Sequence, residues 1–222
     1  MYAPLLETGR LVLVPGNHDR MGHDLAVGLM DGTRVHVVHR PGLFIVRLDS
    51  TAPHNRSSIA SHGVLSPADI DAVDVALDGA LPDALVVLML HHHLLPLPED
   101  RFTEKIANFL GWPYAAELPL GRQLLERIQG KCDLVLHGHR HAASELHLRP
   151  TARRPLHVYN AGSSGVLGWV RLVSHRAGAL LSASWIQTDR PELTPRLPAP
   201  ARAENAVHSA GERTAASPLT DP

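Results

Sequence analysis

Three apolar stretches of this sequence each end in polar side chains that can bind a metal ion or transfer a proton. They are Arg10–Asp19 (RLVLVPGNHD), Leu85–His93 (LVVLMLHHH) and Leu134–Ala142 (LVLHGHRHA). Short apolar runs bounded by turn residues are typical of buried strands. The polar residues that close these runs are Asn17, His18, Asp19, His91, His92, His93, His139 and His141. Three strands with such ends favour a fold that gathers strand ends at one place.

The segments between these runs predict a mixed α/β fold. A helix is expected to begin after Ser66, the N-cap residue, with Pro67 in its first turn, and to end at Leu81. The apolar stripe of this helix is Ile70, Val73 and Leu77. A second helix is expected over Pro119–Gln129 and ends at Gly130. The further expected strands are 33–39 and 43–48, which form a hairpin, then 132–136, 156–160, and a closing antiparallel pair at 168–173 and 180–187.

The order of these elements predicts one domain over residues 10–187, preceded by a linker at 1–9. Residues 188–222 are rich in Pro, Ala and Arg without periodicity, which predicts a disordered tail. Within the domain, Leu94–Ala116 is expected to hold a helix and a mobile flap.

Composition excludes several classes of protein. The net charge is −1 with neutral histidine, so no basic field indicates nucleic acid or an anionic membrane as partner. The single cysteine, Cys132, excludes an internal disulfide and fits a reducing compartment. No apolar run approaches the length of a membrane span, and no signal-peptide pattern opens the sequence. We therefore expect a cytoplasmic protein.

Polar strand ends are where sites form in open α/β sheets. Any one histidine after a strand is more often a solvated side chain than a ligand. The residues Asn17, His91, His139 and His141 follow three separate strands, however, and chance does not readily place all of them at one sheet edge. Imidazole nitrogens and an amide oxygen suit first-row divalent metals such as Zn, Mn, Fe or Co. The sequence therefore predicts a metal site at this edge.

Taken in order, GNHD at residues 16–19, His91-His92 after LVVLML, and Gly138-His139-Arg140-His141 after LVL resemble the motifs of the calcineurin-like metallophosphoesterase family. Weaker matches are the segments LDST at 48–51 and VYNAGSS at 158–164. The resemblance covers about residues 10–187. It implies a four-layer α-β-β-α sandwich of mixed sheets with two metal ions in a crevice between strand ends.

The resemblance also implies a role for each matching residue. Asn17, His91 and His139 would bind one metal, and His141 would bind the other. His18 would protonate the leaving oxygen or stabilise the transition state, and Asp19 would orient its neighbours. His92 would face the substrate or support the ligands, and His93 would be structural. Arg140 would contact the phosphate, or lie solvated on the surface.

The function implied is hydrolysis of a small phosphate ester, a diester or a monoester, by a metal-activated hydroxide. Two metal ions would hold the hydroxide and neutralise the charge on the phosphoryl oxygens, while His18 supplies a proton. The ions would be Mn, Fe, Zn or Co: two in the intact family site, with a single ion in this chain as the alternative. Neither the substrate nor the oligomeric state follows from the sequence.

Two family motifs are missing from the chain. The family has an Asp-x-His and a Gly-Asp before GNHD, which supply the second metal's ligands and a bridging carboxylate. No aspartate here has a histidine two residues later, and no Gly-Asp pair occurs. We therefore expect an N-terminally incomplete domain that belongs to a longer enzyme.

Two other functions are compatible with the residues. One is a truncated, non-catalytic remnant that binds a single metal or a partner. The other is a structural α/β domain whose histidines are incidental, which the order of the motifs disfavours.

Overall fold

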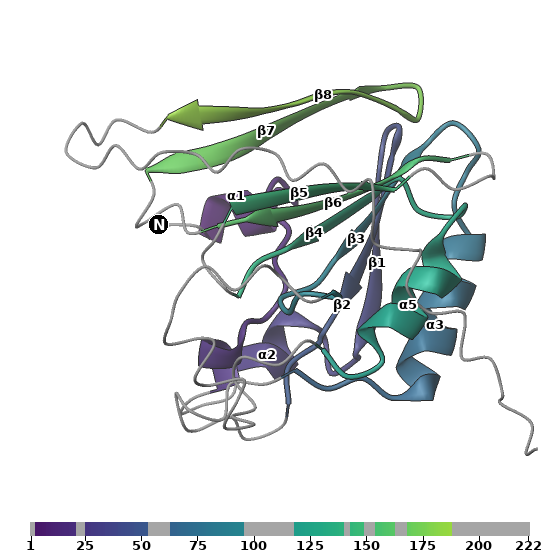
Figure 1. Ribbon diagram of the computed structural model, residues 1–222. Coiled ribbons are helices and arrows are strands. Elements are labelled where there is room, and N and C mark those ends of the chain that lie inside the picture. Colours follow the sequence, from purple (N-terminus) through teal and green to yellow (C-terminus); the bar gives the residue numbers. More distant parts are fainter. Residues whose placement is uncertain are drawn as a thin grey trace, which may run out of the picture.

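In this computed structural model, the described residues are 3–20, 25–52, 63–95, 118–139, 143–148, 154–162 and 168–187. They form a mixed α/β fold around a six-stranded sheet of order β1-β2-β3-β4-β6-β5 (Figure 1). The strands are β1 Val35–Arg40, β2 Leu43–Leu48, β3 Leu85–Met89, β4 Leu134–His137, β5 Ala143–Leu148 and β6 Leu156–Ala161. Strands β2, β3, β4 and β6 are parallel, and the outer strands β1 and β5 are antiparallel to their neighbours. The parallel strands therefore end at a common edge.

The predicted hairpin is confirmed by β1 and β2, which pair from Val35 with Leu48 to Arg40 with Leu43. Its turn is Pro41-Gly42, where Gly42 has a φ of 68° that a residue without a Cβ adopts at no steric cost. The predicted strands at 85–90, 132–136 and 156–160 correspond to β3, β4 and β6.

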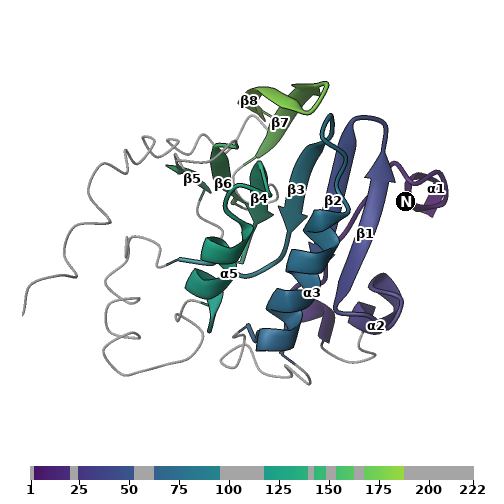
Figure 2. The ribbon, with the colours of Figure 1, turned by 90° about the vertical axis from the view of Figure 1, so that its right-hand side faces the viewer.

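Helices α3 (Pro67–Asp78) and α5 (Gly121–Ile128) cover one face of the six-stranded sheet (Figure 2). The predicted cap of α3 is confirmed, because the Ser66 hydroxyl accepts from Asp69 N while the Asp69 carboxylate accepts from Ser66 N. The apolar stripes of both helices are buried: Ile70, Val73 and Leu77, and Leu124, Leu125 and Ile128. Leu120 falls inside the predicted second helix but instead precedes α5, with a φ of 63° and an exposed fraction of 36%. Its left-handed backbone turns it away from the helix stripe.

The other face of the sheet packs against a two-stranded antiparallel sheet, β7 (Trp169–Arg176) and β8 (Ala179–Gln187). This pair confirms the predicted closing strands. Its inward side chains Val173, Leu180 and Ala183 contact a core cluster on the large sheet made of Ile45, Leu85, Val87, Leu134 and Tyr159. The described chain thus has three layers: helices, a large sheet and a small sheet.

The apolar run at 10–14 is not a strand, which corrects the prediction made from its sequence. Val12 packs on the face of the sheet that also carries β7 and β8, and Leu13 O accepts from Arg47 Nε at 2.6 Å. Both edges of β2 are already paired with β1 and β3, so the run lies over β2 instead of joining the ladder. An apolar run that covers a sheet has the same composition as one inside it.

Three short helices occupy the N-terminal part: α1 Ala3–Glu7, η1 Asn17–Arg20 and α2 Leu25–Leu29. Helix α1 lies inside the segment predicted as a linker. Most of the expected flap at 94–116 and all of the expected tail at 188–222 fall outside the described residues. None of the helices in the described parts is long and apolar enough to cross a membrane.

Candidate metal centre

The candidate centre lies at the carboxyl ends of three adjacent parallel strands. The chain leaves β2 through Asp49, Ser50 and Thr51, leaves β3 toward His91, and leaves β4 toward His139. Met89 of β3 pairs with Leu136 of β4, and Gly138 N donates to His91 O at 3.0 Å. The ladder therefore continues past the strands and holds the histidine-bearing segments at the same level.

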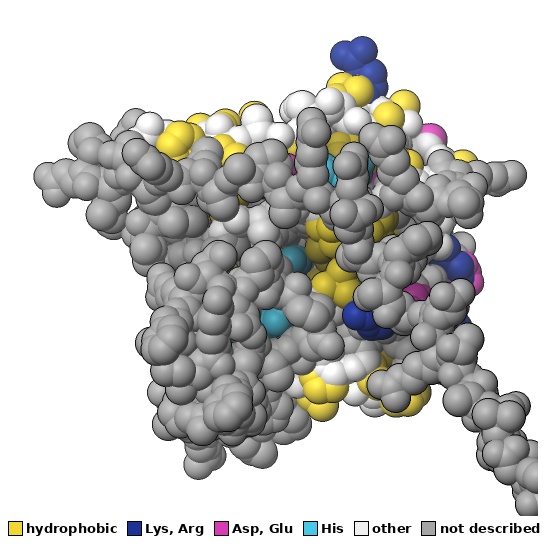
Figure 3. Space-filling view, viewed as in Figure 1, with side chains coloured by type: hydrophobic (Ala, Val, Ile, Leu, Met, Phe, Trp, Pro, Cys, Tyr) yellow, Lys and Arg dark blue, Asp and Glu magenta, His cyan; other side chains and the backbone are white. Residues whose placement is uncertain are grey.

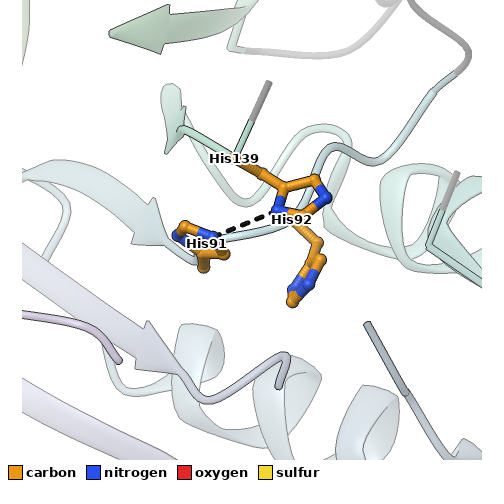
Figure 4. Close-up of side chains that lie close together, drawn as sticks. All are labelled: His91, His92 and His139. Carbon is orange, nitrogen blue, oxygen red and sulfur yellow. Dashed lines mark hydrogen bonds between the residues drawn. The ribbon is translucent and has the colours of Figure 1, made fainter. Parts of the chain in front are cut away.

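Three side chains from separate parts of the sequence make contact at this edge. His91 Nε2 lies 2.7 Å from Asn17 Oδ1 and 3.2 Å from His139 Nδ1. Figure 4 shows the rings of His91 and His139 turned toward each other, with His92 beside them. One ligand atom from each of the three histidines lies within 4.8 Å of the others. Asn17, His91 and His139, which the sequence predicted to share a metal, are thus neighbours in space.

The backbone around these rings is constrained. His139 has a φ of 73°, the left-handed region that a residue with a Cβ rarely adopts. Strained backbone of this kind is concentrated at functional sites. A Cβ added at Gly16 would lie 2.9 Å from Cε1 of His91, so only glycine lets the GNHD turn approach that ring.

The GNHD turn places Asn17 through local hydrogen bonds. Gly16 N donates to Asp19 Oδ2 at 2.7 Å, and Asp19 N donates to Gly16 O at 3.0 Å. These bonds are compatible with a local orienting role for Asp19, which stays a prediction. Asn17 is buried, whereas His18 is exposed on η1. The proton-donating role of His18 stays a prediction.

A serine that the sequence did not single out for a role supports the histidines. Ser50 Oγ accepts from the backbone N–H groups of His91 and His92, both at 3.2 Å, and lies 2.9 Å from His92 Nδ1. Ser50 and His92 are both buried. Its only sequence signal was its place in LDST, directly after a parallel strand.

Asn160 plays a similar part behind His139. Its Nδ2 donates to Gly138 O at 3.2 Å, and its Oδ1 accepts from Gly162 N at 2.9 Å. It is fully buried at the end of β6. Beside it, burial lowers the pKa of His137 to about 4, so this imidazole is neutral near pH 7. Asn160 falls within the VYNAGSS match, which pointed to the segment without assigning the residue.

Two predicted site residues, Arg140 and His141, lie outside the described residues. His93 is buried, and its ring stacks on that of His139 with centroids 6.1 Å apart, which suits its predicted structural role. On the face drawn in Figure 3, a few histidine side chains reach the surface beside hydrophobic ones.

The contacting atoms fit a divalent transition metal. An amide oxygen and two imidazole nitrogens are accepted ligands for Zn, Mn, Fe and Co. The separations of 2.7 and 3.2 Å are close to those of neighbouring ligand atoms that each lie about 2.0–2.2 Å from one ion. Neutral imidazoles are the form that binds metal.

Comparison with known proteins gives a distant structural likeness. No family model matches the chain, and no curated protein matches it. Among solved structures, the chain is similar to the "Putative 5'-Nucleotidase" from Staphylococcus aureus, in complex with alpha-ketoglutarate, with 15% identity and a TM-score of 0.46. The match covers 87% of this chain and 42% of the other, so the chain spans less than half the length of that protein. At this TM-score we draw no conclusion about fold or function from the likeness.

Proposed function

We propose that this chain carries a metal-dependent phosphoesterase site. The observation that supports the proposal is the contact of Asn17 Oδ1, His91 Nε2 and His139 Nδ1 at the carboxyl edge of the sheet. These atoms come from sequence positions far apart, and each belongs to a motif that resembles the metallophosphoesterase family. The residues would hold Mn, Fe, Zn or Co.

The layers of the described chain fit this proposal. Helices α3 and α5, the six-stranded sheet and the β7–β8 sheet would be three layers of the α-β-β-α sandwich that the family resemblance implies.

A bound divalent ion supplies Lewis-acid activation of water and neutralises charge on phosphoryl oxygens. The residues of this chain would do the remainder. Asn17, His91 and His139 would fix the position of the ion, and Asp19 would hold the turn that carries Asn17. His18 would donate a proton to the leaving oxygen from its exposed place on η1. The substrate would be a small phosphodiester or phosphomonoester.

The experiment is hydrolysis of bis-p-nitrophenyl phosphate and p-nitrophenyl phosphate by the full chain with added Mn²⁺. We expect metal-dependent turnover that His139→Ala abolishes. Turnover that persists in both His91→Ala and His139→Ala would overturn the proposal. Comparison of the two substrates separates diesterase from monoesterase activity.

A second candidate function is binding of one metal ion without hydrolysis. It is favoured by the donor set in the described part of the chain, where the cluster consists of histidines and an amide and includes no carboxylate. Metal content measured on the purified chain tests this function. One ion per chain, bound through His91 and His139 without turnover of either substrate, would establish it in place of the esterase.

A further inference from the structure

We propose that Ser50 holds His92 in the tautomer that carries its proton on Nε2, which makes His92 a hydrogen-bond donor to the bound phosphoryl group and not a metal ligand. The tautomer follows from hydrogen bonds within the chain, whereas the donor role rests on the function proposed above. His92 is the one histidine of the cluster whose part the sequence left open between substrate contact and support.

The hydrogen bonds of Ser50 determine the direction of its bond to His92. A hydroxyl oxygen has two lone pairs and one hydrogen. The backbone N–H groups of His91 and His92 both donate to Ser50 Oγ and occupy its two lone pairs. The hydroxyl hydrogen is then what lies between Oγ and Nδ1 of His92, 2.9 Å apart. Nδ1 must accept this bond, so the proton of the neutral ring is on Nε2.

Burial makes it costly to replace the hydrogen bond between Ser50 and His92. Ser50 is 0% exposed and His92 is 2% exposed, so water does not offer a substitute partner at low cost. The ring is also held in place from another side, because a Cβ at Gly63 would lie 2.7 Å from Cγ of His92 and 2.9 Å from its Nδ1. A rotation that presented Nδ1 to a metal would break the serine bond within a packed interior.

His91, unlike His92, has a ring nitrogen that lies next to the other proposed metal ligands. Its Nε2 contacts both Asn17 Oδ1 and His139 Nδ1, so a metal ion that replaces a proton at this atom finds the other donors already beside it. Metal binding through Nε2 of His92 would instead require that ring to lose its proton or to move it to Nδ1, opposite the Ser50 hydroxyl.

The site would then contain groups that bind a cation and a group that donates a hydrogen bond to an anion. Asn17, His91 and His139 offer lone pairs to a cation. The ring of His92 lies next to that of His139, with centroids 4.6 Å apart, and in the proposed tautomer it carries its proton on Nε2. An N–H next to a cation suits an anion that touches both, as a phosphoryl oxygen would. Ser50 acts through His92 and is a positioning residue.

The tautomer is tested by nitrogen-15 NMR of the full chain with labelled histidine. We expect the His92 ring to show a protonated Nε2 and an unprotonated Nδ1, assigned by comparison with His92→Gln. Ser50→Ala should lose this preference, and Ser50→Thr, which keeps the hydroxyl, should restore it. A protonated Nδ1 on His92 in the unmodified chain would refute the tautomer assignment.

The donor role is tested by binding, with Zn²⁺ alone and then with inorganic phosphate added to the Zn²⁺-loaded chain. His92→Ala should bind Zn²⁺ within about threefold of the unmodified chain but bind phosphate about 10- to 100-fold more weakly, the loss expected for one hydrogen bond to a charged group. His92→Gln, whose side-chain amide reaches the Nε2 position, should recover part of the phosphate affinity, and the shorter His92→Asn should not.

The outcomes separate this proposal from the proposed function. If His92→Ala loses Zn²⁺ as severely as His91→Ala does, His92 is a ligand and the proposal is wrong. If the chain binds Zn²⁺ and phosphate as expected but hydrolyses neither ester, the esterase function fails while the role of His92 stands. Equal phosphate affinity in His92→Ala and the unmodified chain would exclude the donor role.

Discussion

Within the described residues, histidine rings touch one another in two parts of the molecule, at the carboxyl ends of β3 and β4 and across the paired strands β5 and β6. In the second part, His147 and His157 are direct cross-strand partners with their Nδ1 atoms 2.7 Å apart. His147 Nε2 lies 3.5 Å from the Glu145 carboxylate, which in turn pairs with Arg171. Both groups have close nitrogens, yet their surroundings differ.

The difference lies in where the donors come from and what holds them. At the carboxyl edge, Asn17, His91 and His139 arrive on three separate segments, and Ser50 and Asn160 fix the backbone behind them. The β5–β6 pair takes both nitrogens from one ladder, with the side chain of His147 46% exposed. Close imidazoles alone do not indicate a metal centre, and convergence of independent segments is the better indicator.

The largest expected effect follows directly from this comparison. His91→Ala should weaken Zn²⁺ binding by about 100-fold or more, since removal of even a supporting group costs about 10- to 100-fold. His147→Ala, which removes an equally close imidazole, should change the affinity by less than about twofold. Isothermal titration with Zn²⁺ measures both. A comparable loss in the two variants would mean that the β5–β6 pair, and not the strand ends, holds the metal.

Arg171 gives the next largest effect, on stability instead of binding. Its guanidinium lies 4.3 Å from the centroid of Tyr159 and 4.1 Å from that of Trp185, and it donates to Glu145 at 2.5 Å. Since its side chain is 5% exposed, Arg171→Ala should lower the free energy of unfolding by about 2 kcal/mol.

Urea denaturation measures the loss caused by Arg171→Ala. Zn²⁺ affinity should be retained, because Arg171 supports the small sheet and not the carboxyl edge. Unchanged stability would show that the contacts between β7–β8 and the large sheet do not depend on this side chain.

A smaller effect on Zn²⁺ affinity is expected from substitution of two glycines near the metal centre, Gly16 and Gly138. Gly16→Ala would bring a Cβ to 2.9 Å from the His91 ring, whereas a Cβ at Gly138 meets nothing within 4 Å. We expect Gly16→Ala to weaken Zn²⁺ binding about tenfold by displacing that ring, and Gly138→Ala to bind as the unmodified chain does. If Gly138→Ala were the more damaging change, His91 would not be the ring that the GNHD turn positions.

Much of the fold could be predicted because local chemistry decided it. The Ser66 cap and the stripe of α3 depend on residues three and four apart, and the Pro41-Gly42 turn depends on adjacent residues. The run at 10–14 could not be placed, since an apolar segment that lies over a sheet and one that pairs within it have the same composition. Strand β5 was not predicted, because only its last four residues, Glu145–Leu148, alternate polar with apolar side chains, and so short a pattern is a weak strand signal.

The residues of the candidate site can also be separated into those that the sequence predicted and those that it did not. His91 and His139 were predicted as neighbours because parallel strands end at one edge, a rule that needs only strand order. Asn17 was predicted by the same rule, although the run before it lies over the sheet and is not a strand. Ser50 and Asn160 were not assigned, because their roles depend on which backbone groups the register brings within reach. A serine after a strand is common, and nothing in its sequence shows that it accepts from two histidine amides.

The smallest expected effect is a pH dependence of stability from the β5–β6 pair. Burial, and then the nearby His147, lower the pKa of His157 below its ordinary value of 6.5 in the folded chain. In the unfolded chain the ring recovers that value and binds more protons, so the stabilising contribution is present above about pH 6.5 and is lost as the pH falls below it. His147 and Tyr159 contact this ring, and Glu145 lies further along the ladder. Asp133 and Arg154 line a cavity together with His157.

His157→Gln should therefore lose less stability than the unmodified chain when the pH is lowered from about 7.5 to about 5.5, measured by urea midpoints. His147→Gln should remove only part of the dependence, because burial, the larger cause, remains. Both variants leave the carboxyl edge intact, so their Zn²⁺ affinities at pH 7.5 should match that of the unmodified chain. If instead His157→Gln steepened the acid loss, the ring would be stabilised in its charged form by Glu145, and the β5–β6 pair would be an ion-paired group unlike the neutral imidazoles of the metal centre.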